Sequence, residues 1–201
     1  MNFLSIDCST NIGSLFVKVE NKTFNKVLQS DKSSNDLLMK RILEFFIENG
    51  VRFDDISKIF VNQGPGNFSG LRGSLAVAKG ISFAKNLNLV GYNTFMWSCT
   101  KFFKKKDFIY SFIHFRKKFF VKKFDFNLKS VSNVEEVTTK IIMKNYSNKF
   151  KVIPKNMIKH FDKKILKLKD LEIVDLDHNE LEFLQLNALL DEELIKPLYL
   201  S

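Results

Sequence analysis

The sequence predicts an α/β protein that folds as two lobes, with residues 1–104 in the first lobe and residues 105–201 in the second. Three features carry this prediction. The first thirty residues alternate as strands do. An apolar helix follows, and then a strand, a glycine-rich turn and a second helix. Finally, Lys104, Lys105 and Lys106 mark a shift to a short, lysine-rich second half.

Composition fits a globular protein, because 45% of the 201 residues are hydrophobic. The net charge is +10, and it comes almost entirely from lysine. Lys, Phe and Asn share A/T-rich codons, so this charge alone does not demonstrate a nucleic-acid partner. No apolar run is long enough to cross a bilayer. The first residues lack a basic region, so we expect a strand there, no membrane contact and a cytoplasmic location.

In the first lobe we expect strands at residues 3–7, 13–20 and 23–28, joined as an antiparallel meander through a turn at residues 21–22. A helix then runs to about residue 49, with Ser33 and Asp36 as a capping box and Gly50 as its stop. Apolar residues cover far more than the roughly 100° arc that packing on one sheet requires. Either the core is deep or a partner covers this helix.

A strand at residues 56–62 leads into the run GPGNFSGLRG at residues 64–73 and a helix over residues 70–86. Gly73, Val77, Gly80 and Ala84 recur at three- and four-residue spacings and give this helix a flat face of mostly small side chains. Each interior glycine costs about 1 kcal/mol relative to alanine, so close packing must compensate. A strand at residues 87–92 and a helix at residues 94–103 complete the lobe.

In the second lobe, residues 108–113 and 119–126 predict a hairpin. Residues 134–143 predict a helix, and residues 157–168 and 179–194 further helices. The tail at residues 196–200 is predicted to be extended and to pack back on the first lobe.

The turn after the first strand is one candidate phosphate site. Asp7, Ser9 and Thr10 could hold a metal-bound phosphate together with Gly66 and Ser69, or Asp7 and Ser9 could simply satisfy the turn. The second interpretation is favoured. The glycine run fits neither a Walker loop nor a Rossmann fingerprint. Its glycines could expose a helix N-terminus to phosphate or allow tight packing, and both stay open.

The sequence gives little support to a disulfide framework, a metal site, a serine nucleophile or an RNA-binding platform. Cys8 and Cys99 form no CxxC pair, so we expect two buried thiols and neither a disulfide framework nor a zinc site. Ser69 has no base or GxSxG elbow beside it, and no two histidines fall at metal-ligand spacing on one element. Residues 101–123 interleave basic and aromatic residues. Two amphipathic strands explain this better than an RNA platform.

Four segments resemble one known family. The glycine run and the following LVGYNT at residues 89–94 resemble the GPGSFTGLR segment and the next strand of the bacterial TsaB (YeaZ) family. LSIDCST at residues 4–10 resembles its first strand, and KPLYL at residues 196–200 resembles its tail. The resemblance is strong over the first hundred residues and patchy beyond.

The resemblance implies an actin-like ATPase (ASKHA, ribonuclease H-like) fold with two lobes of mixed sheets flanked by helices. It also implies pairing with a TsaD-type paralogue, which holds the metal, and with a TsaE-type ATPase. The assembly places threonylcarbamoyl on the adenosine next to the tRNA anticodon. The two first-lobe helices would form the pairing surface, with candidate residues Leu38, Ile42, Phe45, Arg72, Gly73, Val77, Gly80 and Ala84.

Two departures favour a non-catalytic role. Residues 33–40 lack the His-x-x-x-His metal motif of TsaD, and the hairpin at residues 113–120 reads IHFRKKFF, without the family's Asp and Gly. A hairpin without glycine does not easily bring its backbone to a phosphate. We therefore expect a scaffold subunit with no cofactor of its own, ATP and metal being bound by its partners. A homodimer, an autonomous small ATPase or peptidase, and a stand-alone RNA binder remain alternatives.

Overall fold

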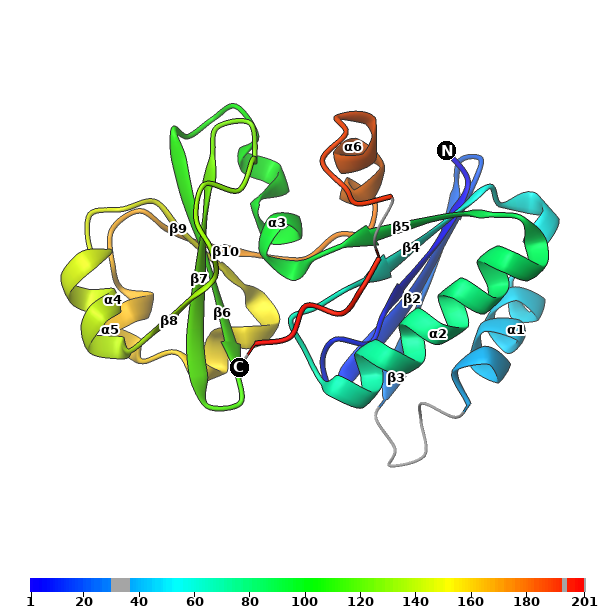
Figure 1. The fold of residues 1–201 in the computed structure, drawn as a ribbon, viewed down its shortest axis with the longest axis horizontal. Helices are drawn as coiled ribbons and strands as arrows, with labels where there is room; N and C mark the ends of the chain where they lie inside the picture. The colour runs from blue at the N-terminus through cyan, green and yellow to red at the C-terminus, as the bar shows by residue number, and fades with distance from the viewer. Residues whose placement is uncertain (30–36, 193–194, 201) are drawn as a thin grey trace. The chain divides into compact units, whose positions relative to one another are not determined.

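The computed structural model describes residues 1–29, 37–192 and 195–200, and these divide into two compact units (Figure 1). Unit 1 contains residues 1–94 and 190–201, and unit 2 contains residues 95–189. The units thus divide ten residues before the predicted boundary at residue 104. Ser98 explains the difference, because its hydroxyl lies 2.8 Å from that of Ser111 in the second sheet. The final segment belongs to unit 1.

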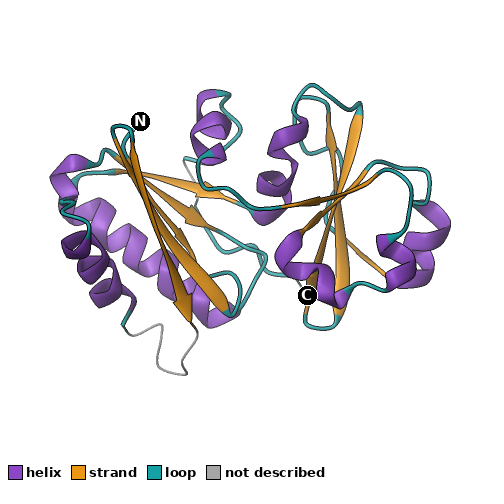
Figure 2. Ribbon diagram, turned by 180° about the vertical axis from the view of Figure 1, so that it is seen from behind, coloured by secondary structure: helices purple, strands orange, loops and turns teal. Residues whose placement is uncertain are grey.

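Unit 1 is a five-stranded mixed sheet with the strand order β3-β2-β1-β4-β5. Strands β1 (Phe3–Asp7), β2 (Ile12–Val19) and β3 (Lys22–Gln29) form the antiparallel meander that the sequence predicts. Strands β4 (Lys58–Asn62) and β5 (Asn88–Tyr92) add in parallel to β1. Figures 1 and 2 show helices α1 (Leu38–Glu48) and α2 (Phe68–Lys85) on the same face of this sheet.

The core of unit 1 lies between these two helices and the sheet. Leu4 and Ile6 of β1 point toward the helices, and Phe3 packs on the other face against Phe60 with ring centroids 5.0 Å apart. This division follows from the alternation of side chains along a strand. The predicted capping box at Ser33 and Asp36 lies outside the described residues.

Unit 2 is a second five-stranded sheet, with the order β10-β9-β6-β7-β8. Strands β6 (Phe108–Phe115) and β7 (Lys118–Asp125) form the predicted hairpin, and β8 (Glu135–Val137) extends it. Strands β9 (Lys151–Pro154) and β10 (Leu171–Val174) run parallel to β6 and to each other.

Helices cover both faces of this second sheet. Helix α3 (Thr94–Cys99) contacts Ser111, whereas Tyr146, at the end of α4 (Thr139–Asn145), packs against the neighbouring Phe112. Because Ser111 and Phe112 point to opposite faces of β6, the two helices lie on opposite sides. Helices α5 (Lys163–Leu166) and α6 (Glu180–Leu186) and the 3₁₀ turn Lys155–His160 complete the unit.

Three predictions in the second half need correction. The helix predicted over residues 134–143 is wrong in its first part, because residues 135–137 form β8. The helix predicted over residues 179–194 ends at Leu186, and residues 157–168 hold only the end of a 3₁₀ turn and the four-residue α5. Strands β9 and β10 were not predicted, because four-residue runs interrupted by charge give almost no periodic signal. Among the described residues, no helix has the length and apolar character required to span a membrane.

The carboxyl group of Glu180, at the start of α6, makes the stability of unit 2 depend on pH. Burial raises its pKa to about 7, against the attraction of the Lys101 ammonium 3.7 Å away. A raised pKa in the folded state contributes stability that is lost as pH rises from the ordinary value of 4.5 to about 7.

We therefore expect Glu180→Gln to match the parent chain below pH 4.5 and to exceed its stability by roughly 2 kcal/mol above about pH 8. Thermal unfolding of both chains across this range measures the difference. Glu136→Gln is the control, since its carboxylate forms an exposed ion pair with Lys118, and such pairs contribute little. A constant difference between Glu180→Gln and the parent chain would contradict the prediction.

Candidate docking surface and glycine-rich segment

Asp7, at the end of β1, is buried and held by hydrogen bonds. Its Oδ1 accepts from the backbone N–H of Ser9 at 2.9 Å and from Asn62 Nδ2 at 3.1 Å. Asn62 also lies 3.1 Å from the Thr94 hydroxyl and accepts from the Gly64 N–H at 2.8 Å. Burial raises the pKa of Asp7, and these hydrogen bonds oppose the shift. The carboxyl group thus links β1, β4 and the start of α3.

The glycine-rich segment packs directly on the turn that follows Asp7. The Asn67 N–H donates to the Ser9 carbonyl at 2.7 Å. A Cβ added at Gly66 would clash with the Ser9 backbone, 2.6 Å from its Cα. A Cβ added at Gly70 would clash with the Cys8 carbonyl. These glycines therefore let two backbones approach closely.

The predicted phosphate-turn residues fall into two groups. Asp7, Ser9 and Gly66 come together and are buried under the loop. Thr10 makes local bonds to Ile12, and the Ser69 hydroxyl donates to Asn67 Oδ1 at 3.2 Å. Since Asn67 N–H already bonds to Ser9, close packing accounts for the glycines. A phosphate site here stays a prediction.

The tail after residue 195 lies along the same segment. Leu198 N–H donates to the Gln63 carbonyl at 2.7 Å, and Gln63 Nε2 donates to the Lys196 carbonyl at 3.1 Å. The Tyr199 ring stacks on Phe68, and its hydroxyl accepts from Arg72 Nε at 3.0 Å. The tail therefore fixes the loop and the first turn of α2.

The potential nucleophiles and metal ligands Cys8, Cys99 and His178 are buried inside the fold. Cys8 and Cys99 are buried free thiols, as predicted, and burial raises the pKa of each to about 12. His178 is buried with its ring centroid 4.9 Å from that of Trp97, and burial lowers its pKa to about 4. No group of three metal-ligating side chains occurs within residues 1–29, 37–192 and 195–200.

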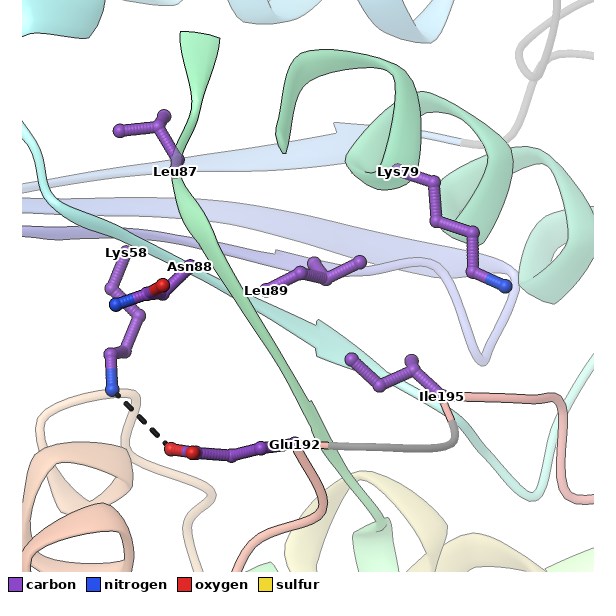
Figure 3. Close-up of a pocket in the computed structure, with 7 residues that line it drawn as sticks. All are labelled: Lys58, Lys79, Leu87, Asn88, Leu89, Glu192 and Ile195. Atoms are coloured by element: carbon purple, nitrogen blue, oxygen red, sulfur yellow. Dashed lines mark ion pairs between the residues drawn. The ribbon is translucent and has the colours of Figure 1, made fainter. Parts of the chain in front are cut away.

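A pocket of about 540 Å³ lies elsewhere in unit 1, along the edge strand β5 (Figure 3). Lys58 and Glu192 point toward each other and form an ion pair of 3.6 Å at its wall, and Lys79 reaches it from α2. Its lining residues are Lys58, Lys79, Leu87, Asn88, Leu89, Glu192 and Ile195. None belongs to the turn after β1 or to the glycine run, so this pocket is separate from the predicted phosphate turn.

Helix α1 has two apolar faces. Leu38, Ile42 and Phe45, which the sequence assigned to the pairing surface, are at most 2% exposed and lie in the core of unit 1. This corrects their assignment, because the unit's own sheet and α2 cover them. The opposite face carries Met39, Leu43 and Ile47, which are 37%, 42% and 79% exposed. The sequence alone indicates that these three residues form one face, because residues four positions apart lie on the same side of a helix.

Helix α2 presents a flatter surface. Gly80 and Ala84 are exposed, and Gly73 and Val77 are half-buried. A Cβ at Gly80 would meet nothing within 4 Å. Phe83, which the sequence prediction omitted, is 93% exposed. We call Met39, Leu43, Ile47, Gly80 and Phe83 the helix surface. Arg72 lies apart from it, held between Phe68 and Tyr199.

Comparisons with known proteins show similarity to proteins of threonylcarbamoyladenosine formation in sequence and to YeaZ in fold. Residues 28–108 match the family model of TsaD, tRNA N6-adenosine threonylcarbamoyltransferase. The tRNA threonylcarbamoyladenosine biosynthesis protein TsaB of Buchnera aphidicola subsp. Baizongia pistaciae is 34% identical over 84 residues, which span 42% of this chain and 38% of that protein. The match thus covers less than two thirds of the relative's length.

Solved structures extend the likeness to the whole chain. YeaZ from Pseudomonas aeruginosa superposes with a TM-score of 0.71 at 15% identity, covering 99% of each chain. A second structure from that organism, described as similar to peptidase YeaZ, gives 0.73 at 15% identity and covers 100% of this chain and 99% of that one. These likenesses show the α/β ribonuclease H-like fold. In sequence, the chain is similar to a TsaB protein over part of its first half, and in fold it is similar to YeaZ over nearly its whole length.

Proposed function

We propose that this chain acts in threonylcarbamoyladenosine formation on tRNA, as a non-catalytic subunit that pairs with a TsaD-type transferase. The TsaD family model and the curated TsaB relative support the process. The helix surface is the observation that carries the pairing. A TsaE-type ATPase and tRNA join through the assembly, and nucleotide and metal are held by the partners.

The helix surface suits a helical partner for two reasons. Ile47 and Phe83 are 79% and 93% exposed on neighbouring helices, and exposed apolar side chains gathered on one face mark interaction sites. The open space at Gly80 lets another backbone come close. A partner helix there would bury both large side chains.

The absence of catalysis rests on the turn after β1. Asp7 is engaged by Ser9 and Asn62, and the N–H of Asn67 bonds to Ser9 instead of facing an anion. This arrangement favours a structural role for Asp7. ATP or peptide turnover by the purified chain that Asp7→Asn abolishes would overturn this part of the proposal.

We expect Ile47→Glu and Phe83→Glu each to weaken pairing with a TsaD-type protein at least about tenfold, because a buried interface would have to accept an unpaired carboxylate. Co-purification and titration by light scattering measure the affinity, and modification of tRNA by the mixture gives the second readout. Both variants should fold normally, since their side chains are exposed.

Val27→Glu is the matched control, because Val27 is 62% exposed on β3 and lies outside the helix surface. It should pair as the parent chain does. Unchanged pairing in all three variants would contradict the docking surface. Sedimentation of the chain alone tests whether the same surface forms a homodimer.

A further inference from the structure

The positive charge of the chain is concentrated in one unit. Unit 2 holds 20 Lys and Arg residues against 11 Asp and Glu, whereas unit 1 holds 12 against 11. A codon bias would enrich lysine in both units alike. Genome composition therefore does not explain an excess that falls almost entirely on residues 95–189, and the surface of unit 2 needs its own explanation.

Lysines and aromatic rings gather at the end of the second sheet, where β6 begins and β7 ends. The Lys123 ammonium lies 3.6 Å from the ring centroid of Phe108, which is its diagonal neighbour on β6, next to the directly opposite Tyr110. The Lys104 N–H donates to the Phe126 carbonyl at 2.7 Å, which brings the segment before β6 against the end of β7. We call Lys104, Lys106, Phe108, Lys123 and Phe126 the basic-aromatic end.

Lys106 extends this cluster toward β9. Its ammonium lies 4.5 Å from the ring centroid of Phe150. The Phe150 carbonyl accepts from Tyr110 N–H at 3.0 Å, so the loop before β9 lies beside β6. Three chain segments thus contribute cations and rings to one end of the sheet.

Two of the rings are open to solvent. The amphipathic pattern of the hairpin accounts for Phe112, Phe120 and Phe124, which are at most 4% exposed. It does not account for Phe108 and Phe126, which are 47% and 49% exposed. Exposed rings beside ammonium groups offer both partners that an unpaired nucleotide uses, a stacking surface and a phosphate contact.

The lysines of this end are not neutralised within the described chain. Lys101, Lys118 and Lys155 of unit 2 form ion pairs, whereas Lys104, Lys106 and Lys123 form none with the residues that the structure describes. Two acids adjoin this end, Asp107 and Asp125. Asp107 is exposed and forms no ion pair with a described residue, and Asp125 uses Oδ1 to accept from the backbone N–H groups of Asn127 and Lys129. The positive charge is therefore available to an external anion.

We infer that the basic-aromatic end binds unpaired nucleotides of RNA, with Phe108 and Phe126 stacking on bases and Lys104, Lys106 and Lys123 contacting phosphates. This surface is in unit 2 and does not depend on the docking proposed for unit 1. It can be tested on the chain alone.

The test uses fluorescence anisotropy of the full chain with a labelled RNA hairpin that carries an unpaired loop, and with a duplex of the same stem. Phe108→Ser should weaken hairpin binding about tenfold and leave duplex binding nearly unchanged, because only unpaired bases stack. Lys104→Glu/Lys106→Glu should weaken both and lower the salt dependence of the hairpin affinity.

Lys163→Glu/Lys164→Glu is the matched control, since it reverses the same number of charges on the exposed start of α5 in the same unit. Equal loss in the two double variants would show that binding follows net charge alone and would overturn the inference. Displacement of the hairpin by polyglutamate as readily as by unlabelled RNA would point to an acidic protein partner and would also overturn it. Circular dichroism checks that each variant is folded.

Discussion

Gly70→Ala is expected to destabilise unit 1 by about 3 kcal/mol, because the new methyl group has to displace the Cys8 backbone. Gly80→Ala, ten residues further along the same helix, is expected to stabilise the chain by up to about 1 kcal/mol, because alanine is the better helix former and the site is open. Thermal and chemical unfolding of the two variants measure the opposite signs.

This pair separates two uses of glycine in α2. At Gly70 the missing side chain lets the helix touch the turn after β1, while Gly80 faces outward and is free to meet another protein. Gly66→Ala should behave like Gly70→Ala, since a Cβ there meets the backbone of Ser9. Equal stability of Gly70→Ala and Gly80→Ala would contradict the close packing described for this segment.

Lys151→Met is expected to destabilise unit 2 by about 3 kcal/mol. The Lys151 side chain is 0% exposed, and its ammonium donates to backbone carbonyls of Tyr146, Lys169, Ser147 and Lys149, the first two at 3.0 and 2.8 Å. Methionine fills a similar volume but leaves these buried oxygens without a donor. Burial lowers the pKa of this lysine, yet the surrounding carbonyls favour its charged form.

Lys149→Met is the control for Lys151→Met, because the Lys149 side chain is exposed two residues away in the same loop. Its effect should stay within about 0.5 kcal/mol, as for most surface substitutions. Denaturant titration of both variants gives the comparison. A similar small loss for Lys151→Met would show that the four carbonyls find other donors and that the lysine is dispensable.

Local sequence patterns were enough to predict the main helices and strands of the first lobe. The meander through β3, the helix α1 and the strand–glycine–helix unit around Gly66 each have a periodic or turn signal within one short window. Strands β9 and β10 have none, because each is only four residues long and includes a charged residue, Lys151 at the start of β9 and Glu172 within β10. β9 pairs with β6 and β10 pairs with β9, and these pairings depend on contacts between residues far apart in the sequence.

The helix surface was only partly predictable for a related reason. The sequence shows that α1 is apolar on more than one side, but not which side the sheet covers. Leu38 and Met39 are adjacent and both apolar, yet the first is 2% and the second 37% exposed. The positions of the sheet and of α2 decide which face is buried, and the periodicity of the sequence does not give those positions.

The tail along the glycine-rich segment has a consequence for the order of folding during synthesis. Gln63 and Lys196 are 133 positions apart, and Arg72 and Tyr199 are 127 apart. Unit 2 lies between them in the chain, so the ribosome completes it before the last strip of unit 1 emerges. During synthesis, the glycine-rich loop of unit 1 therefore stays uncovered until the tail at residues 196–199 has been made, after unit 2 is complete.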